Sequence, residues 1–253
     1  YARTAYTIER EFSRRGYEVI LCNTGGDRAE TLRYLQAVNQ KQVDGIVLVG
    51  SVFDTICQGA EMEKLLTGVP VVLANGKLDL PNAYSVTVDD KYGVSLAVEH
   101  LVARGRKSIY YIKDRDTDSA KSKRDGFLEA MRRNGLEFAD HVLEAGETLA
   151  SGMETVQALL AQGIVPDGIV CGEDLTAAGA LKALLRAGLR VPEQVAVVGF
   201  NNSDYAHLCE PVLTSVDNKP EQVALLCVQL LESSIERSEA YSSVVLQPEL
   251  AQG

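Results

Sequence analysis

The stretch VAVVGFNN, residues 195–202, decides the fold of this chain. An apolar run of four residues is followed by Gly199, Phe200 and two asparagines, Asn201 and Asn202. A short continuous apolar run is typical of a parallel strand that is buried on both faces. Open α/β sheets bind their ligands beyond the carboxyl ends of such strands. The two amide side chains therefore mark a candidate binding position.

Similar apolar runs recur along the chain and alternate with amphipathic helical stretches. We expect strands at 18–22, 45–49, 69–74, 108–112, 168–171, 195–199, 213–216 and 243–246. Gly105, Gly135 and Gly188 stand where three of the intervening helices are expected to end. This alternation predicts an α/β fold with mainly parallel sheets. The first helical stretch, 4–15, has no strand before it, and we expect that such a strand has been cut off.

The chain is long enough for two lobes. Its 253 residues exceed the roughly 100–150 that are usual for one domain. The segment KDRDTDSA, residues 113–120, is polar and has no helical or strand periodicity. We interpret this segment as the crossing from a first lobe to a second.

Charge and cysteine content restrict what the chain binds and where it works. The formal net charge is -10, so the surface is expected to repel DNA and anionic membranes. No apolar run reaches the roughly 18 residues of a membrane helix, and no signal peptide is visible. The 5 cysteines form no CxxC pair, which favours free thiols in a cytoplasmic protein.

The motifs of common catalytic sites are missing from the sequence. It contains no P-loop, no GxGxxG after a strand, no GxSxG elbow and no HExxH. The histidines His100, His141 and His207 are scattered. We therefore expect no catalytic residue, no metal and no cofactor, and we interpret the chain as a binding protein rather than an enzyme.

Several blocks, in the right order, resemble the LacI family of bacterial transcription regulators. They are VDGIVLVGS (43–51), VPVVLANGKLD (69–79), VTVDDKYGVSLAVEHLVARGRKSIYYI (86–112), SAKSKRDGFLEAM (119–131), GIVPDGIVCGEDLTAAGALKAL (163–184), GLRVPEQVAVVGFNN (188–202) and LTSVDNKPEQV (213–223). The resemblance covers about residues 17–250, which is nearly the whole chain.

The resemblance implies an α/β fold of two Rossmann-like lobes with parallel sheets joined by three crossovers, the periplasmic binding protein-like arrangement. The N-terminal lobe would take residues 1–112 and 215–237, and the C-terminal lobe 113–214 and 238–253. A small-molecule effector would bind in the cleft between the lobes. The family also implies a homodimer, with operator DNA bound by an N-terminal helix-turn-helix segment that this chain does not contain.

Candidate effector-binding residues follow from the matching positions. Lys123 stands where the family has an arginine, Glu173 where it usually has an asparagine, and Asn201 where it has an aspartate. Ser119 and Asn218 match polar positions that line the cleft in several members. A lysine offers one flexible point charge where an arginine offers a rigid fork of donors. These departures bear directly on which effector the site would accept.

Three interpretations of the cleft stay open. The effector is atypical rather than a simple hexose, or an ordinary sugar binds through rearranged contacts, or the cleft binds no small molecule and the regulator senses a protein partner. A rival class is a periplasmic sugar-binding protein that serves a transporter. The five unpaired cysteines and the block VPEQVAVVGF favour the regulator over that rival.

Overall fold

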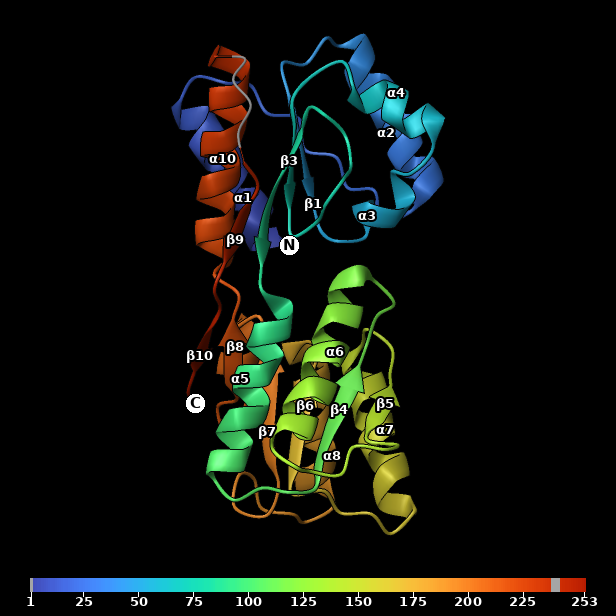
Figure 1. Cartoon of the computed structure of the whole chain (residues 1–253), viewed down its shortest axis with the longest axis vertical. Helices are drawn as coiled ribbons and strands as arrows, with labels where there is room; N and C mark the ends of the chain where they lie inside the picture. The colour runs from blue at the N-terminus through green and yellow to red at the C-terminus, as the bar shows by residue number, and fades with distance from the viewer. Residues whose placement is uncertain (1, 238–241) are drawn as a thin grey trace. The chain divides into compact units, whose positions relative to one another are not determined.

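The computed structural model describes residues 2–237 and 242–253 and divides the chain into two units. Unit 1 contains the described residues of Tyr1–Val88 and Lys219–Leu246, and unit 2 contains Asp89–Asn218 and Gln247–Gly253. The chain therefore passes from one unit to the other three times, as the resemblance implied. Each unit is a mainly parallel sheet with helices on both faces (Figure 1).

Unit 1 is built on a four-stranded parallel sheet with the order β1-β2-β3-β9. The strands are β1 (Ile46–Val49), β2 (Val71–Ala74), β3 (Ala83–Val88) and β9 (Val244–Leu246). Helices α1 (Ala2–Arg14) and α10 (Pro220–Arg237) cover one face, and α2 (Arg28–Gln40), α3 (Phe53–Ile56) and α4 (Ala60–Leu66) cover the other. Alternate residues of β2 enter the two cores: Val72 packs with the first group of helices, and Leu73 with the second.

Unit 2 is built on a six-stranded sheet with the order β10-β8-β7-β6-β4-β5. The strands are β4 (Ile109–Lys113), β5 (Val142–Glu144), β6 (Gly168–Cys171), β7 (Ala196–Phe200), β8 (Thr214–Asp217) and β10 (Glu249–Ala251). Only β10 is antiparallel to its neighbour. Helices α5 (Asp90–Ala103) and α6 (Asp118–Arg133) cover one face, α7 (Leu149–Ala161) and α8 (Asp174–Arg186) cover the other, and α9 (Asp204–His207) follows β7.

Strand β7, which corresponds to the strand predicted at 195–199, lies inside unit 2 and is buried on both faces. All residues of β7 are buried. Val198 and Phe200 pack with α5 and α6, whereas Val197 packs with α8 on the opposite face. The predicted buried parallel strand is therefore confirmed.

The predicted strand at 18–22 is wrong. These residues are all described, and they form no strand. Ile20 is exposed, and Leu21 keeps 72% of its surface accessible. An apolar run forms a strand only when a neighbouring backbone hydrogen bonds to it, and no such ladder joins this described segment to β1.

The predicted lobe boundaries also need correction. The strand expected at 108–112, observed as β4, pairs with β5 and β6 in unit 2 rather than belonging to the N-terminal lobe. The strand expected at 243–246, observed as β9, pairs with β3 at Val86 and Val244 and so belongs to unit 1. Of the predicted C-terminal portion 238–253, residues 238–241 lie outside the described residues, and only Gln247–Gly253 belong to unit 2. The first crossing is at Val88–Asp89, because residues 113–120 connect β4 to α6 within unit 2.

Candidate functional site

The predicted binding residues all lie in unit 2, at the edge of the sheet where its parallel strands end. Glu173 follows β6, Asn201 follows β7, and Asn218 follows β8. Ser119 and Lys123 lie on α6, the helix that follows β4. Because β6, β7 and β8 are neighbours in the sheet, the first three side chains come from adjacent positions.

Glu173, Asn201 and Asn218 form a chain of hydrogen bonds. Asn201 donates from Nδ2 to Oε2 of Glu173, and Asn218 donates from Nδ2 to Oδ1 of Asn201 over 2.7 Å. An ionised carboxylate only accepts hydrogen bonds, so Glu173 fixes the orientation of both amides. Within the described structure, Oδ1 of Asn218 is then left without a hydrogen-bond partner. This series of hydrogen bonds thus ends on a free acceptor, the side-chain oxygen of Asn218.

The backbone at this position is in an unfavourable conformation. Asn201 and Asn202 have φ values of 101° and 47°, in the region that non-glycine residues rarely adopt. The segment is held there by hydrogen bonds from Asn201 N to Val216 O (2.8 Å) and from Asn202 N to Ser215 Oγ (2.9 Å). Such strain, of order 1–3 kcal/mol for a residue, is found preferentially at functional sites.

Lys123 is buried near these hydrogen-bonded residues and has only 7% of its surface accessible. Its Nζ donates to the backbone oxygen of Gly172 over 2.9 Å and lies 3.9 Å from the centre of the Phe200 ring. The carbonyl and the aromatic face both stabilise a cation in a region with little water. The ammonium group therefore supports the strand end that carries Glu173.

Ser119 contacts the site through a residue that the sequence did not single out. Its hydroxyl donates to Oδ2 of Asp90 over 2.6 Å. The preceding residue, Asp89, caps α5 by accepting from Tyr92 N over 2.9 Å, which leaves the Asp90 carboxylate available. Burial raises the pKa of Asp90, although the charge of Lys123 and the Ser119 hydrogen bond lower it in part. Asp90 therefore ionises less readily than a carboxyl group in water.

A second carboxylate and a phenol lie beneath Glu173. Asp114 is buried and accepts from the hydroxyl of Thr176 over 3.3 Å. A Cβ atom at Gly172 would lie 2.9 Å from Oδ1 of Asp114 and 3.2 Å from the hydroxyl of Tyr111, so a larger residue here would displace these side chains. The hydroxyl of Tyr111 has no hydrogen-bond partner among the residues described. Burial and then the charge of Glu173 raise the pKa of Asp114.

Asp174 has a structural role at the same edge of the unit 2 sheet. The N-cap of α8 is Glu173, and its side chain makes no capping bond with the described backbone. Asp174 instead accepts from the backbone and the hydroxyl of Ser203 (2.7 and 2.8 Å) and from the hydroxyl of Ser215 (2.6 Å). This carboxylate joins α8 to the segment after β7 and to β8, and it holds the strand ends together.

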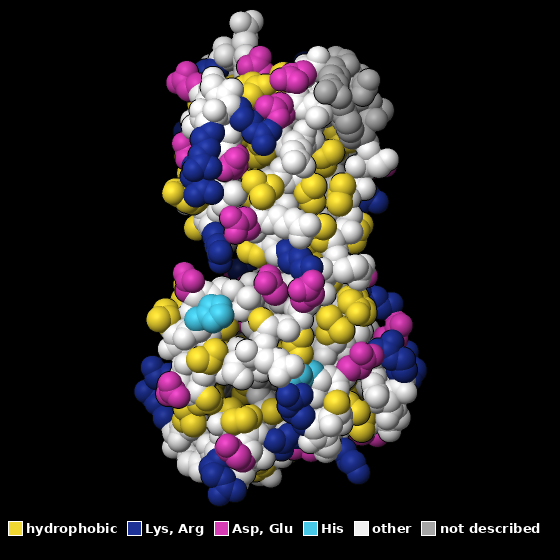
Figure 2. Space-filling view, turned by 90° about the vertical axis from the view of Figure 1, so that its left-hand side faces the viewer, with side chains coloured by type: hydrophobic (Ala, Val, Ile, Leu, Met, Phe, Trp, Pro, Cys, Tyr) yellow, Lys and Arg dark blue, Asp and Glu magenta, His cyan; other side chains and the backbone are white. Residues whose placement is uncertain are grey.

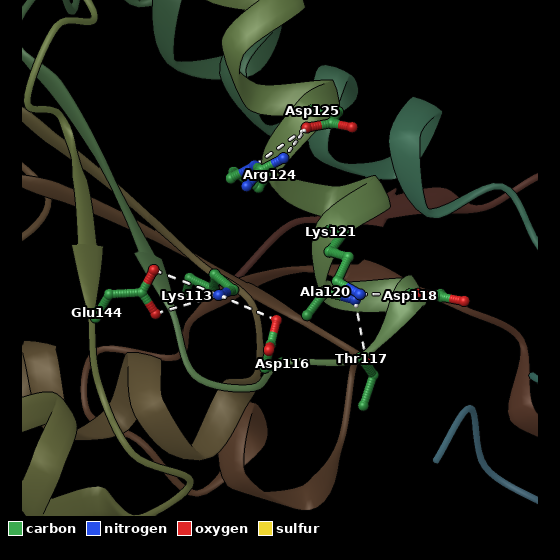
Figure 3. A network of polar contacts seen from close by, with 9 residues as sticks. All are labelled: Lys113, Asp116, Thr117, Asp118, Ala120, Lys121, Arg124, Asp125 and Glu144. Atoms are coloured by element: carbon green, nitrogen blue, oxygen red, sulfur yellow. Dashed lines mark hydrogen bonds and ion pairs between the residues drawn. The ribbon is translucent and has the colours of Figure 1, made fainter. Parts of the chain in front are cut away.

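The polar segment 113–120 supplies ion pairs to the edge of the sheet. Arg115 lies 3.2 Å from Oε2 of Glu147 and 3.8 Å from Oε1 of Glu173. Figure 3 shows Lys113 between Glu144 and Asp116, at 3.3 and 3.6 Å. The segment is polar because it carries these charged side chains at a strand end, and not because it links two lobes.

The arrangement is suited to non-covalent recognition of a polar molecule. It combines carboxylates, amides, hydroxyls and two cations around strand ends in one unit. In the part of the chain that the structure describes, no group of three or more His, Cys, Asp and Glu side chains is placed to hold a metal ion. No described helix is both long and apolar enough to cross a membrane.

Comparisons with known proteins agree with this arrangement. Residues 98–253 match the periplasmic binding protein-like domain family. An HTH-type transcriptional regulator of Lachnoclostridium phytofermentans is 30% identical over 98% of this chain and 76% of its own length. The structure of the transcriptional regulator CelR with cellobiose has a TM-score of 0.88 and 27% identity, and it covers 99% of this chain and 77% of the other.

A LacI transcriptional regulator from a Rhodococcus species is also similar, with a TM-score of 0.83 and 29% identity. The match covers 98% of this chain and 91% of that protein. The family match, the regulator relative and the two solved structures all agree with the α/β architecture of both units. The chain therefore belongs to the periplasmic binding protein-like family, and within it to the LacI-type transcriptional regulators.

Proposed function

We propose that this chain is the effector-sensing core of a LacI-type transcriptional regulator and that it acts by binding rather than by catalysis. The effector is a small molecule that binds at the carboxyl edge of the unit 2 sheet. The observation that carries this proposal is the chain from Glu173 through Asn201 to Asn218 across three adjacent strand ends. Open α/β sheets place their ligands at such a position.

The chemistry of the site favours a small polar effector such as a sugar or a related metabolite. Carboxylate and amide groups at strand ends bind hydroxyl-rich molecules through several directional hydrogen bonds. The similar regulator CelR has been solved with cellobiose, which supports the same class of effector for this chain. The strained backbone at Asn201 supports a binding role for the segment after β7.

The regulator would act in the cytoplasm as a homodimer that binds operator DNA through a helix-turn-helix segment preceding this chain. The chain itself carries a net charge of -10. On the face drawn in Figure 2, basic and acidic side chains are interspersed rather than gathered into a basic patch. DNA affinity would therefore come from the preceding segment. An effector that binds one conformation better than another would shift the population and so change the affinity for DNA.

Ligand titration tests the proposal. We expect at least one sugar, sugar derivative, nucleoside or polyol to raise the melting temperature and to bind with measurable heat in calorimetry. The substitutions Asn201→Ala and Lys123→Ala should each weaken that binding. If no compound of these classes shifts the melting temperature, the chain is not a sensor of a small polar metabolite. Sequencing of any residues encoded before Tyr1 distinguishes the two classes of protein. A helix-turn-helix segment there indicates a regulator, whereas a signal peptide indicates a periplasmic binding protein.

A further inference from the structure

One of the two hydrogen-bond donors of each strand-end amide is used within the site. Asn201 gives one to Glu173, and Asn218 gives one to Asn201. The acceptors are in excess, because Asn218 keeps a free carbonyl oxygen within the described structure and a carboxylate accepts about four hydrogen bonds. Even with the second N–H of each amide counted, acceptors outnumber donors, so a ligand with several donors suits this site.

Glu173 lies at the centre of a group of carboxylates. Its charge raises the pKa of three other carboxyl groups, in each case after burial, which is the largest cause. They are Asp90, Asp114 and Asp174. The geometry agrees: Asp174 is the next residue along the chain, and Oδ1 of Asp114 lies 2.9 Å from the position of a Cβ atom at Gly172, the residue before Glu173.

The hydrogen bonds that these carboxylates receive come mostly from neutral groups. Asp90 accepts from Ser119, and Asp114 accepts from Thr176. The backbone and hydroxyls that bind Asp174 are neutral as well. Neutral donors satisfy the oxygens but leave the negative charge in place.

Two cations of unit 2 accompany this group, and both are engaged. Lys123 donates to a backbone oxygen and lies on the ring of Phe200. Arg115 is divided between Glu147 and Glu173. The carboxylates around Glu173 therefore outnumber the cations.

An independent observation points to a ligand at the same place. Tyr111 is fully buried, and its hydroxyl is without a hydrogen-bond partner in the described chain. This hydroxyl lies next to Gly172, and the charges of Asp114, Asp90 and Glu173 all raise the pKa of Tyr111, with burial as the largest cause. An orphaned polar group inside a protein costs free energy unless a partner is supplied.

We propose that the effector carries a protonated amino group, which binds beside Glu173 at the carboxyl edge of unit 2. An ammonium group has three donors and no acceptor, and so it matches a site with excess acceptors and excess negative charge. An anionic effector such as a sugar phosphate would meet repulsion there. This inference rests on the proposed function, since it names the chemical class of the effector for the same site.

The test uses sets of matched probes on the 253-residue chain. Each set holds an amine, its neutral analogue and an anionic analogue: glucosamine, glucose and glucose 6-phosphate; galactosamine, galactose and galactose 6-phosphate; putrescine, butanediol and succinate. We expect an amine to raise the melting temperature and to bind at least tenfold more tightly than its neutral partner, with an affinity that falls as salt is added. Binding of a neutral or anionic member in preference to its amine overturns the inference and leaves the proposed function standing. If none of these probes binds, while a nucleoside or another neutral polyol does, the inference is overturned in the same way.

A variant that removes one negative charge tests whether Glu173 binds the amino group. Glu173→Gln keeps an acceptor and removes the charge, so the affinity for the amine should fall about ten- to a hundredfold, and it should fall several times more than the affinity for the neutral partner. Glu154→Gln, at an exposed position of α7, is the matched control and should leave both affinities unchanged. Melting temperatures without ligand show whether each variant is folded. Equal loss for the amine and its neutral partner in the folded Glu173→Gln variant would contradict the inference.

Discussion

Units 1 and 2 share one architecture and differ in the polar groups that they bury. In unit 1 the buried polar side chains of the described residues are hydroxyls: Thr4, Thr7, Thr31, Ser51, Ser85 and Ser234. Unit 2 also buries charged side chains: Lys113, Asp114, Lys123 and Asp174. Buried charges cost free energy unless they are well partnered. Since unit 1 forms a parallel sheet with helices on both faces without them, the fold does not need these charges, and we interpret them as parts of the binding site and its support.

The largest stability effect should come from a buried charge of unit 2. Asp174→Ala removes the acceptor of three hydrogen bonds from Ser203 and Ser215, and we expect it to lower the free energy of unfolding by about 3 kcal/mol. In unit 1, Thr31→Ala removes one bond to Asp27 O and should cost about 1 kcal/mol. Urea denaturation followed by circular dichroism measures both. Equal losses would remove the distinction between the units.

Among these amide substitutions, a loss of effector affinity is expected only for the hydrogen-bonded residues at the strand ends, Glu173, Asn201 and Asn218. Asn201→Ala breaks the link between Glu173 and Asn218, so the affinity for any effector found by titration should fall at least about tenfold. Asn39→Ala is the control, because this amide holds α2 to α4 in unit 1 by donating to Leu65 O, and it also donates to Leu35 O of its own helix. It should reduce stability and leave affinity unchanged. Normal affinity in Asn201→Ala would place the effector elsewhere.

A smaller effect should appear in the dependence of stability on pH. The pKa of Asp90 is raised in the folded protein, mainly by burial, so the folded state binds this proton more tightly than the unfolded chain. Ionisation of Asp90 therefore costs stability, and the cost is relieved as the pH falls through the raised pKa. Asp90→Asn should raise the melting temperature at pH 7, by an amount equivalent to about 1 kcal/mol or less.

The comparison with the parent protein should be repeated at lower pH. The advantage of Asp90→Asn should vanish near pH 4, about where an aspartate of the unfolded chain titrates. A constant advantage at all pH values would show that the change acts through packing rather than through charge.

The smallest effects should come from ion pairs whose carboxylate is exposed, and here the units should not differ. Glu144→Gln weakens the contact with Lys113 in unit 2 (Figure 3), and Glu30→Gln weakens the pair with Arg33 in unit 1. Each should change the free energy of unfolding by less than about 1 kcal/mol. A much larger loss for Glu144→Gln, measured by urea denaturation, would mean that the distinction between the units extends to the protein surface.

The sequence predicted the buried strands of this fold better than their assignment to units. The run at 195–199 could be recognised because a strand that is buried on both faces is continuously apolar. The run at 18–22 resembles it, but composition does not reveal whether a neighbouring backbone pairs with it. The polar segment 113–120 was misplaced because a strand-end loop at a binding site and a linker have the same composition.

Part of the candidate site could be predicted, and part could not. Glu173, Asn201 and Asn218 follow strands directly, and the structure brings them together in one chain. Asp90 was missed because an aspartate at the start of a helix is usually the N-cap residue. Only the structure shows that Asp89 caps the helix instead. For Lys123, whose position was predicted, the sequence does not show that the ammonium turns toward Gly172.

Hydrogen–deuterium exchange, with and without a bound effector from the titration panel, locates the effector on the protein. If the effector binds at the carboxyl edge of unit 2, the amides around Glu173, Asn201 and Asn218 should exchange more slowly in its presence, and the amino ends of the same strands should not change. Protection elsewhere, with unchanged exchange at these three strand ends, would contradict the account.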